Sequence, residues 1–333
     1  MPYISDSSYR PPRWLKGRQH LQTIIPSVFR KIKNINAFGQ RLELPDGDFL
    51  DLDWINASGN KNQKADKLVI LSHGLEGSSG RPYITGMAKL FNQHGYDALA
   101  WNMRGCSGQP NRLPEFYHHG SSKDLKEIIK FTLQNTHYQH IVLIGFSLGG
   151  NVTLKYLGEE NTNLPPQIKR AVAFSVPCHL PSSVPLLRQK GFNQYYSDRF
   201  KNKLIEKIKL KKHILGEDFV ARLLPKIKTL DDLTDLFFAN INGFETAEDY
   251  YYLNSSGNFL SNITIPTLIV NAANDPMLSP ECSDIALAQQ SKFVYLEVPA
   301  EGGHCGFMNK NKGQFYWSEH RALAFCEDTQ AQT

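Results

Sequence analysis

The sequence has no long apolar run and little cysteine. Across its 333 residues, no uninterrupted apolar stretch approaches the ~18 residues that a membrane-spanning helix needs. Its first residues, Met-Pro-Tyr-Ile-Ser-Asp, show neither the basic nor the apolar region of a signal peptide. Its five cysteines are scattered without a C-x-x-C pair, which argues against a disulfide framework and a zinc site. We therefore expect a cytoplasmic protein with no stable membrane anchor, no metal and no other cofactor.

Neither sign of charge dominates the chain. The 37 lysines and arginines exceed the 32 aspartates and glutamates by five, and so small an excess gives no reason to expect nucleic acid as a partner. With 41% hydrophobic and 21% charged residues, the composition is that of an ordinary globular protein. The length accommodates one large domain with an insertion, or two domains. These features leave the oligomeric state open.

Short apolar runs recur along the chain and are mostly separated by helical patterns. The runs cover residues 68–72, 98–102, 141–146, 171–176, 267–272 and 293–298, and the helices are expected at 82–94, 121–135, 149–158, 281–290 and 315–326. Uninterrupted runs are typical of parallel strands that are covered on both faces. A hairpin, 41–44 and 50–54 around Asp46-Gly47, should form an antiparallel edge. The sequence thus predicts an α/β fold with a mostly parallel, eight-stranded sheet and helices on both faces.

The alternation of strands and helices also predicts how the chain is divided. Residues 1–36, with prolines at 11, 12 and 26, are expected to form an N-terminal extension with one short helical turn. Residues 37–177 and 261–333 should form the α/β core. Residues 178–260 contain no clear buried strand and should form a helical insertion at the carboxyl ends of the strands. Because ligands bind there in open α/β sheets, we expect the insertion to act as a lid.

The segment Gly-Phe-Ser-Leu-Gly at residues 145–149 joins an apolar run to a helical pattern. This is the context of a nucleophile elbow, in which a sharp turn between strand and helix exposes a serine hydroxyl. The flanking glycines allow strand and helix to pass closely. We therefore predict Ser147 as a nucleophile. A Gly-rich turn before an ordinary helix is the alternative, and it would require no histidine or acid downstream.

A serine nucleophile requires a base and a group that orients the base. His304 follows the last apolar run in Gly-Gly-His-Cys-Gly and is the predicted base, although a loop histidine can also be simply solvated. Asp275 follows the run at 267–272 and is the predicted acid, since the order Ser, Asp, His is that of this type of fold. The run at 171–176 is followed by no carboxylate before Asp198. An Asn-Asp-Pro turn is the structural alternative for Asp275.

Two backbone amides should stabilise the negative charge that develops on the reacting carbonyl oxygen. The amide of Leu148, directly after the serine, is the first candidate. The second is the amide of Leu75 in the loop His-Gly-Leu-Glu-Gly at residues 73–77, with Glu76 as the neighbouring possibility. His73 is expected to position this loop rather than act as a second base.

Other motifs are weaker. His118-His119 lacks a third ligand at a recognisable spacing, so no metal is predicted there. Cys305 adjoins the predicted base and is read as a packing residue. The stretch from Arg199 to Lys212 is amphipathic and basic, which is typical of a half-buried helix with a solvated face. Weak contact with a membrane surface through this stretch is the alternative.

Six motifs together carry a resemblance to a known family. They are Pro-Pro-Arg-Trp-Leu with His-Leu-Gln-Thr-Ile at 11–24, His-Gly-Leu-Glu-Gly-Ser-Ser at 73–79, Asn-Met-Arg-Gly-Cys-Ser-Gly at 102–108, Phe-Ser-Leu-Gly-Gly-Asn at 146–151, Asn-Ala-Ala-Asn-Asp-Pro at 271–276 and Gly-Gly-His-Cys-Gly-Phe at 302–307. The chain resembles the YheT-like group of the α/β-hydrolase superfamily, which includes eukaryotic members of the abhydrolase-domain 1 and 3 type and yeast ethyl-ester synthase/esterases. The resemblance implies an α/β-hydrolase fold, a Ser147, Asp275 and His304 triad, and carboxylic-ester substrates.

Together these observations predict a serine carboxylesterase that acts on small-molecule esters with short to medium acyl chains through an acyl-enzyme. Three alternatives stay open. An acyltransferase would pass the acyl group to an alcohol, as an ester synthase does. A phospholipase- or lipase-like enzyme would release acyl groups from lipids. A protein of another class would use the same fold for binding without catalysis.

Overall fold

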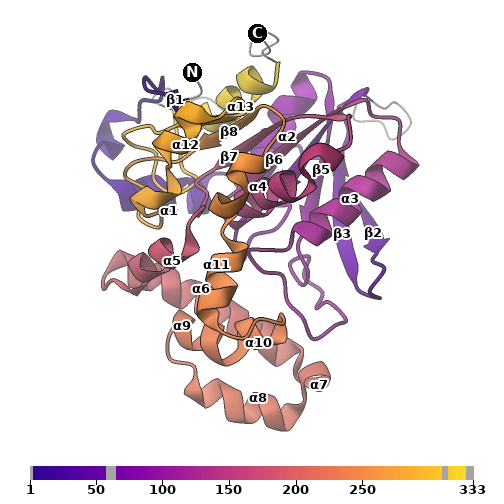
Figure 1. Cartoon of the computed structure of the whole chain (residues 1–333), viewed down its shortest axis with the longest axis vertical. Helices are drawn as coiled ribbons and strands as arrows, with labels where there is room; N and C mark the ends of the chain where they lie inside the picture. Colours follow the sequence, from indigo (N-terminus) through magenta and orange to yellow (C-terminus); the bar gives the residue numbers. More distant parts are fainter. Residues whose placement is uncertain (1–2, 58–64, 310–313, 328–333) are drawn as a thin grey trace.

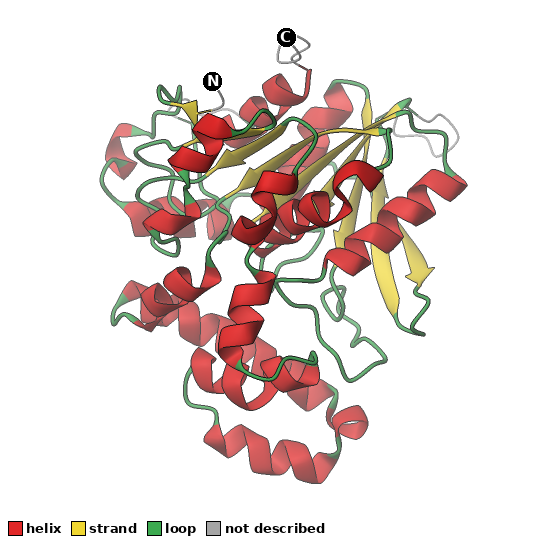
Figure 2. Cartoon of the chain, viewed as in Figure 1, coloured by secondary structure: helices red, strands yellow, loops and turns green. Residues whose placement is uncertain are grey.

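A computed structural model describes residues 3–57, 65–309 and 314–327 of the chain. One sheet of nine strands lies at its centre, with helices against both faces (Figures 1 and 2). The strands, in chain order, are β1 (Tyr3–Ile4), β2 (Phe38–Glu43), β3 (Phe49–Ile55), β4 (Lys67–Ser72), β5 (Tyr96–Asn102), β6 (His140–Phe146), β7 (Ile168–Phe174), β8 (Thr267–Val270) and β9 (Val294–Glu297). In space their order is β1-β9-β8-β7-β6-β4-β5-β3-β2.

The topology confirms the predicted α/β fold. The strands from β5 through β4, β6, β7, β8 and β9 to β1 run parallel, and the hairpin of β2 and β3 forms an antiparallel edge against β5. The eight predicted strands are all present. The ninth, β1, pairs with β9 through only Tyr3 and Ile4. Two residues are too few to give a periodic signal, so the sequence pattern did not reveal this strand.

Helices from widely separated parts of the chain cover the two faces. They are α1 (Gln19–Phe29), α2 (Pro82–Gln93), α3 (Ser122–Asn135), α4 (Leu148–Glu160), α12 (Ile285–Gln290) and α13 (Trp317–Glu327), with short 3₁₀ turns η1 (Arg13–Leu15), η2 (Asn161–Asn163) and η7 (Pro280–Cys282). The side chains of β4 alternate between two apolar cores, Leu68 facing α3 and α4 and Val69 facing α2 and α13. Burial on both faces explains why the apolar runs are uninterrupted.

The N-terminal residues are part of this architecture. Besides β1, they form α1, which runs through Pro26 and is longer than the single turn expected between the prolines. A proline inside a helix removes one backbone hydrogen bond, here the one to the carbonyl of Gln22. Gly306 of a distant loop packs directly against that carbonyl. The helix therefore continues because tertiary contacts compensate for the proline.

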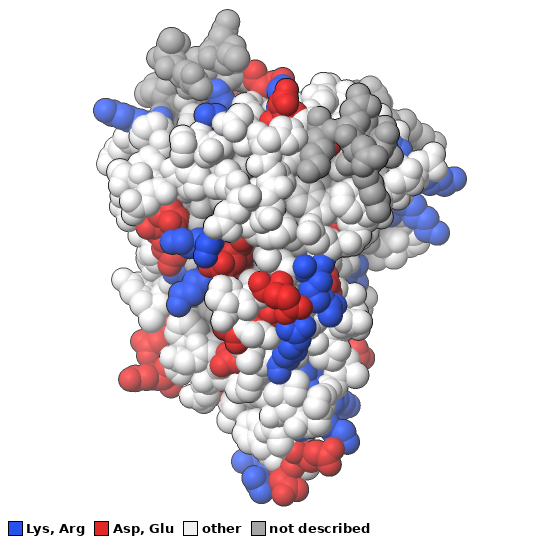
Figure 3. Space-filling model, turned by 90° about the vertical axis from the view of Figure 1, so that its right-hand side faces the viewer, with Lys and Arg blue, Asp and Glu red and all other residues white. Residues whose placement is uncertain are grey.

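Between β7 and β8 the described chain is helical. This segment comprises α5 (Leu180–Ser183), η3 (Val184–Arg188), α6 (Phe192–Leu210), α7 (Lys212–Leu215), α8 (Glu217–Leu223), η4 (Leu224–Lys226), α9 (Leu230–Leu233), the π-helical turn η5 (Thr234–Phe238), α10 (Ala239–Ile241), α11 (Ala247–Asn254) and η6 (Ser256–Asn262). Most of it projects beyond the ends of the strands (Figure 1) and has a small apolar core that includes Leu204, Ile208 and Phe237. Positive and negative side chains lie next to one another over its surface in Figure 3.

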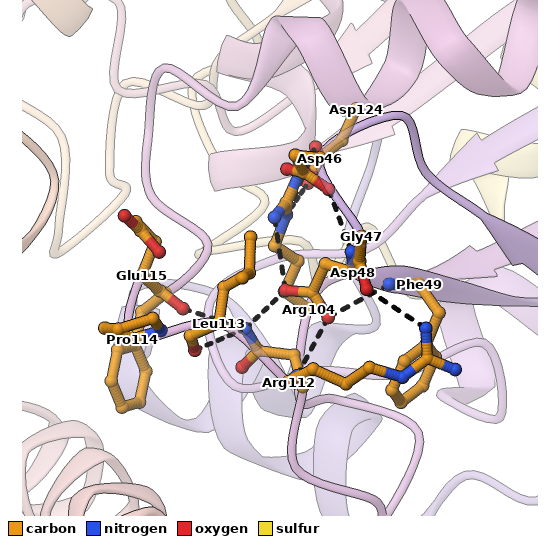
Figure 4. Close-up of polar contacts among 12 residues, drawn as sticks. Asp46, Gly47, Asp48, Phe49, Arg104, Arg112, Leu113, Pro114, Glu115 and Asp124 are labelled. Atoms are coloured by element: carbon orange, nitrogen blue, oxygen red, sulfur yellow. Dashed lines mark hydrogen bonds and ion pairs between the residues drawn. The ribbon is translucent and has the colours of Figure 1, made fainter. Parts of the chain in front are cut away.

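An arginine whose side chain is 13% exposed joins the edge hairpin to the helical layer. Arg104 follows β5 and forms ion pairs with Asp46 and Asp48 from the hairpin turn and with Asp124 from the first turn of α3 (Figure 4). The Asp48 side chain has no exposed surface, and that of Asp124 is 7% exposed. Because a charge is stable in such surroundings only when it is paired, this cluster links three separate segments.

Among the residues that the structure describes, no helix combines the length and the apolarity needed to cross a bilayer.

Candidate active site

Ser147 occupies a sharp turn between β6, which ends at Phe146, and α4, which begins at Leu148. Its backbone has φ 53° and ψ −122°, a conformation that side-chain-bearing residues rarely adopt. The amide of Ser147 donates to the carbonyl of Phe174 on β7 at 2.8 Å and holds the turn in place. A Cβ at Gly145 would collide with Gly149, and a Cβ at Gly149 would collide with the chain leaving β4. The structure thus has the geometry of the predicted nucleophile elbow.

The three residues predicted for the triad lie together in one hydrogen-bonded chain. Nε2 of His304 lies 2.9 Å from Oγ of Ser147, and Nδ1 of His304 lies 2.8 Å from Oδ2 of Asp275. Asp275 has no exposed side-chain surface, and His304 is 12% exposed. Because a carboxylate only accepts hydrogen bonds, Nδ1 of His304 carries the proton and Nε2 is free to accept from the serine hydroxyl.

The loop that carries His304 is held by the N-terminal helix α1. The hydroxyl of Thr23 accepts a hydrogen bond from the amide of His304 at 3.0 Å. The side-chain oxygen of Gln22 accepts from the amide of Gly302 at 2.9 Å and from the side chain of Asn274 at 3.1 Å. The base and the strand end that carries Asp275 are therefore both tied to α1.

Sequence reasoning did not assign a role to Gln22 or Thr23. The block His-Leu-Gln-Thr contributed to the family resemblance, but its spacing gave no indication of the loop that it contacts. The contact joins residues about 280 positions apart in the sequence. Only a known topology places such residues side by side.

The residues of the predicted oxyanion donors, Leu75 and Leu148, line a cavity that Ser147 also lines. Leu148 is the first residue of α4, so its amide is one of those that a helix leaves free at its N-terminus. Leu75 lies in a turn closed by the hydrogen bond from the amide of Gly77 to the carbonyl of Gly74 at 2.9 Å. Among the described residues, neither amide has a hydrogen-bond acceptor. The amide of Glu76, the alternative donor, is occupied by the hydroxyl of Tyr117 at 2.8 Å.

The turn at residues 74–77 lies so close to Ser147 that adding a side chain at Gly74 should disturb the site. A Cβ on Gly74 would lie 3.1 Å from Cβ of Ser147 and 3.3 Å from the carbonyl oxygen of Phe146. We expect Gly74→Ala to lower kcat/KM for an ester about tenfold to a hundredfold, because displacements of this size misalign reacting groups. Gly80→Ala is the matched control, since its nearest neighbour would lie 3.8 Å away. Equal activity of the two variants would contradict the assigned position of the turn.

His73 contacts the turn at residues 74–77, which contains the Leu75 amide. It is fully buried, with Nδ1 2.8 Å from the carbonyl of Gly74 and Nε2 accepting from the amide of Met103 at 3.1 Å. Burial, together with the nearby charges of Lys207 and Arg81, lowers the pKa of His73 from 6.5 to about 4. The ring is therefore neutral near pH 7, as expected for a residue that positions the loop.

This lowered pKa predicts a specific loss of stability in acid. The unfolded chain binds a proton at His73 near pH 6.5 and the folded chain only near pH 4, so stability is full above pH 6.5 and falls as the pH approaches 4. We expect His73 alone to remove roughly 3 kcal/mol of the free energy of unfolding across this interval. Urea unfolding at several pH values would show a shallower decline in His73→Gln. Identical slopes for wild type and variant would contradict the assignment.

Two adjoining cavities meet at the serine. Leu75, Ser147 and His304 line both of them. One, of about 110 Å³, is called the basic cavity because its lining includes Arg30, Arg81, Arg199 and Lys203 against a single acidic residue, Glu76. The other, of about 100 Å³, is called the apolar cavity because its described lining has no lysine, arginine, aspartate or glutamate and includes Leu148, Leu180, Val184, Leu187, Phe200, Leu204, Phe238 and Leu278.

Three further residues noted in the sequence, His118, His119 and Cys305, are partly buried in the structure. His118 and His119 line the apolar cavity, and burial lowers their pKa values to about 3 and about 4. Nδ1 of His118 accepts from the amide of Gly120, and Nδ1 of His119 lies 3.0 Å from the Tyr250 hydroxyl. Burial and the nearby Asp275 raise the pKa of Cys305, which keeps its thiol protonated and in line with a packing role.

Comparison with known proteins identifies the family of the chain. The profile of the α/β-hydrolase fold family matches residues 67–311 of the chain. The chain belongs to the α/β-hydrolase family. This α/β hydrolase is 32% identical to a candidate esterase named YheT from Escherichia coli (strain K12), a match that covers 92% of this chain and 88% of that protein. The YheT-like resemblance is thereby confirmed.

Other relatives of this hydrolase are more distant. The phospholipase ABHD3 of Mus musculus is 26% identical, with coverage of 92% of this chain and 74% of that protein. The solved structure of the esterase Pf2001 of Pyrococcus furiosus is 18% identical and has a TM-score of 0.57, with coverage of 89% of this chain and 94% of that one. At this level of identity, the structural likeness shows the shared fold alone.

Proposed function

We propose that this hydrolase is a serine carboxylesterase that cleaves small acyl esters through a Ser147–His304–Asp275 triad and an acyl-enzyme. The observation that carries the proposal is the continuous hydrogen-bonded chain from Oγ of Ser147 through both ring nitrogens of His304 to Asp275. The relatives named as an esterase and a phospholipase support the same class of reaction. A protein that only binds ligands would not need this arrangement.

Acylation begins when Oγ of Ser147 attacks the carbonyl carbon of the ester and its proton passes to Nε2 of His304. Asp275 holds the ring and stabilises the positive charge that forms on it. The amides of Leu148 and Leu75 donate to the oxyanion, and removal of one such donor typically costs about 3 kcal/mol. When the tetrahedral intermediate collapses, the alkoxide leaves with the proton from His304 and the acyl group stays on Ser147.

Deacylation repeats these steps with water. His304 takes a proton from the water, the resulting hydroxide attacks the acyl-enzyme, and the carboxylic acid is released as Oγ of Ser147 recovers its proton. The apolar cavity is proposed to hold the acyl chain. Leu180 to Phe238 of the segment between β7 and β8 contribute much of its lining, which supports the proposal that residues 178–260 act as a lid.

The acyl-enzyme can be detected directly. A fluorophosphonate probe should label the protein in a one-to-one ratio, and peptide mapping should place the adduct on Ser147. A panel of p-nitrophenyl esters of increasing chain length should give the highest kcat/KM for short to medium chains. The proposal fails if the protein is neither labelled nor active on any of these esters.

The acceptor of the acyl group requires a separate measurement. In the presence of ethanol, a pure hydrolase should give mainly the free acid, whereas an acyltransferase should give mainly the ethyl ester. Product analysis by gas chromatography distinguishes the two outcomes while leaving the assignment of Ser147 unchanged.

A further inference from the structure

Four basic side chains form a row along helix α6. Arg199, Lys203 and Lys207 of α6 and Lys211, the residue directly after it, are spaced four residues apart, so they follow one another along one side. From the sequence, the lysines of this helix were expected on a solvated face. None of these four is exposed, because the row faces the loops that follow β4 and β5.

The C-terminal half of the row is bound by acceptors of the hydrolase core. Nζ of Lys207 lies 2.7 Å from the carboxylate of Glu76. Nζ of Lys211 donates to the side chain of Asn111 and to the carbonyls of Pro114 and Glu115, each within 3.0 Å. These two lysines therefore join α6 to the core, and the structure accounts for their charges.

The N-terminal half of the row has no carboxylate partner. Arg199 and Lys203 line the basic cavity together with Arg81 from the loop after β4. Among the described residues, none of these three cations forms an ion pair with a carboxylate. The fourth cation of that lining, Arg30, is paired with Glu319 at 2.6 Å.

The three cations also act on one another. Arg81 donates to the carbonyl of Glu76 at 3.0 Å, and Nζ of Lys203 lies 3.5 Å from the same oxygen. The guanidinium and the ammonium group therefore both lie against a single carbonyl oxygen. Burial and the charges of Arg81 and Arg199 lower the pKa of Lys203, and they outweigh the opposing charge of Glu76, whose carboxylate is paired with Lys207. A further anion between the three cations would reduce their repulsion.

We propose that Arg81, Arg199 and Lys203 bind a negatively charged group, a carboxylate or a phosphate, on the alcohol half of the ester substrate. The proposal rests on the proposed esterase function. An ester has two halves that meet at the scissile carbonyl, and the two cavities meet at Ser147 and His304. Because the apolar cavity offers the acyl chain a lining without acidic or basic side chains other than histidine, the alcohol half falls in the basic cavity.

The chemistry of the three side chains fits such an anion. A guanidinium presents paired N–H donors that match the oxygens of a carboxylate or a phosphate, and an ammonium adds a third point of charge. The anion would join α6 of the proposed lid, through Arg199 and Lys203, to the core, through Arg81. Binding of this kind selects a substrate by its leaving group rather than by its acyl chain.

The test compares esters that share the acyl chain and differ in the charge of the alcohol half. The three substrates are para-butanoyloxybenzoate, para-butanoyloxyphenyl phosphate and the neutral methyl para-butanoyloxybenzoate. The quantity measured for the wild type and for each variant is the ratio of kcat/KM for each anionic ester to kcat/KM for the neutral ester. We expect this ratio to fall at least tenfold in the double variant Arg199→Gln/Lys203→Gln for the carboxylate, the phosphate or both. The ester with the larger fall identifies the preferred anion.

Two further measurements keep the test independent of folding of the double variant. Arg81→Gln, on the core, should lower the same ratio, and so should higher salt with the wild type, because salt screens charges that solvent reaches. Lys209→Gln is the matched control, since Lys209 is exposed on the same helix and does not line the basic cavity. Its ratio should equal that of the wild type.

Failure of this proposal differs from failure of the esterase function. If the neutral ester is cleaved but neither ratio changes in Arg81→Gln or in the double variant, the anion site is wrong and the esterase function stands. An equal fall in Lys209→Gln would also overturn the anion site, because it would reflect the overall field of the helix. If none of the three esters is cleaved and Ser147 is not labelled, the esterase function itself is wrong.

Discussion

Replacement of Ser147 with alanine is expected to lower kcat for a p-nitrophenyl ester by at least about 10⁴-fold, because the reaction loses its nucleophile while the oxyanion donors remain. The turn at Ser147 and the positions of the Leu75 and Leu148 amides do not depend on Oγ, since the serine amide fixes the turn through Phe174. We therefore expect KM to change little and the free energy of unfolding to stay within about 1 kcal/mol of wild type.

The control for this variant is Ser261→Ala. Ser261 is exposed on η6, and its hydroxyl has only a long contact of 3.5 Å with the Asn262 side chain. It should retain full activity and full labelling by a fluorophosphonate, whereas Ser147→Ala should lose both. Wild-type activity in Ser147→Ala would exclude the proposed triad and would direct attention to another nucleophile in the apolar or the basic cavity.

The parts of the fold that were predicted from sequence are those with a strong local signal. Six of the parallel strands are buried on both faces, so their residues are continuously apolar, and the hairpin has a turn with Asp46-Gly47 between two alternating strands. The triad residues could be proposed because each follows a strand in a fixed order along the chain. The structure brings them into hydrogen-bond contact, and their catalytic roles stay predictions until the variants are measured.

The parts that were not predicted depend on contacts between distant segments. Asn151, in the first turns of α4, donates to the carbonyls of His119 and Asn254 and accepts from the amide of Ser256. It thereby joins the elbow helix to the return of the helical segment. A buried asparagine that satisfies three backbone groups has the same local pattern as any polar helical residue. The same limit applies to Gln22, whose partner Gly302 lies about 280 residues away.

The basic helix α6 shows a second reason why side-chain contacts could not be predicted from the sequence. Its pattern of apolar and basic residues was compatible with a helix lying half-buried on a core or on a membrane, because both present one apolar and one basic face. The directions of Lys207 and Lys211 are set by acceptors of the facing loops, Glu76 and the carbonyl of Pro114. Those acceptors belong to a segment about a hundred residues earlier in the chain, which the helix pattern does not contain.

The largest effect on stability is expected at Arg104. In Arg104→Met, the carboxylates of Asp48 and Asp124 keep their buried positions but lose the cation within 3.2 Å that neutralises them. Breaking a buried ion pair by removal of one partner typically costs about 3–5 kcal/mol, because it leaves an uncompensated charge. Urea unfolding at pH 7 should therefore show a free energy of unfolding lower by about this amount. The loss should be smaller at low pH, where Asp48 and Asp124 take up protons.

Arg112→Met is the control, because Arg112 forms its ion pair with Glu43 at the surface, where the two side chains are 46% and 61% exposed. An exposed pair of this kind contributes little to stability, so Arg104→Met should be clearly less stable than Arg112→Met. Arg104→Lys separates charge from geometry, since a lysine keeps one positive charge but cannot contact Asp46, Asp48 and Asp124 together as the guanidinium does. If Arg104→Met were as stable as Arg112→Met, the cluster would contribute no more than a surface pair. The hairpin edge would then be held by its other contacts, which include the strand pairing of β3 with β5 and the hydrogen bond from Asn111 to Asp48.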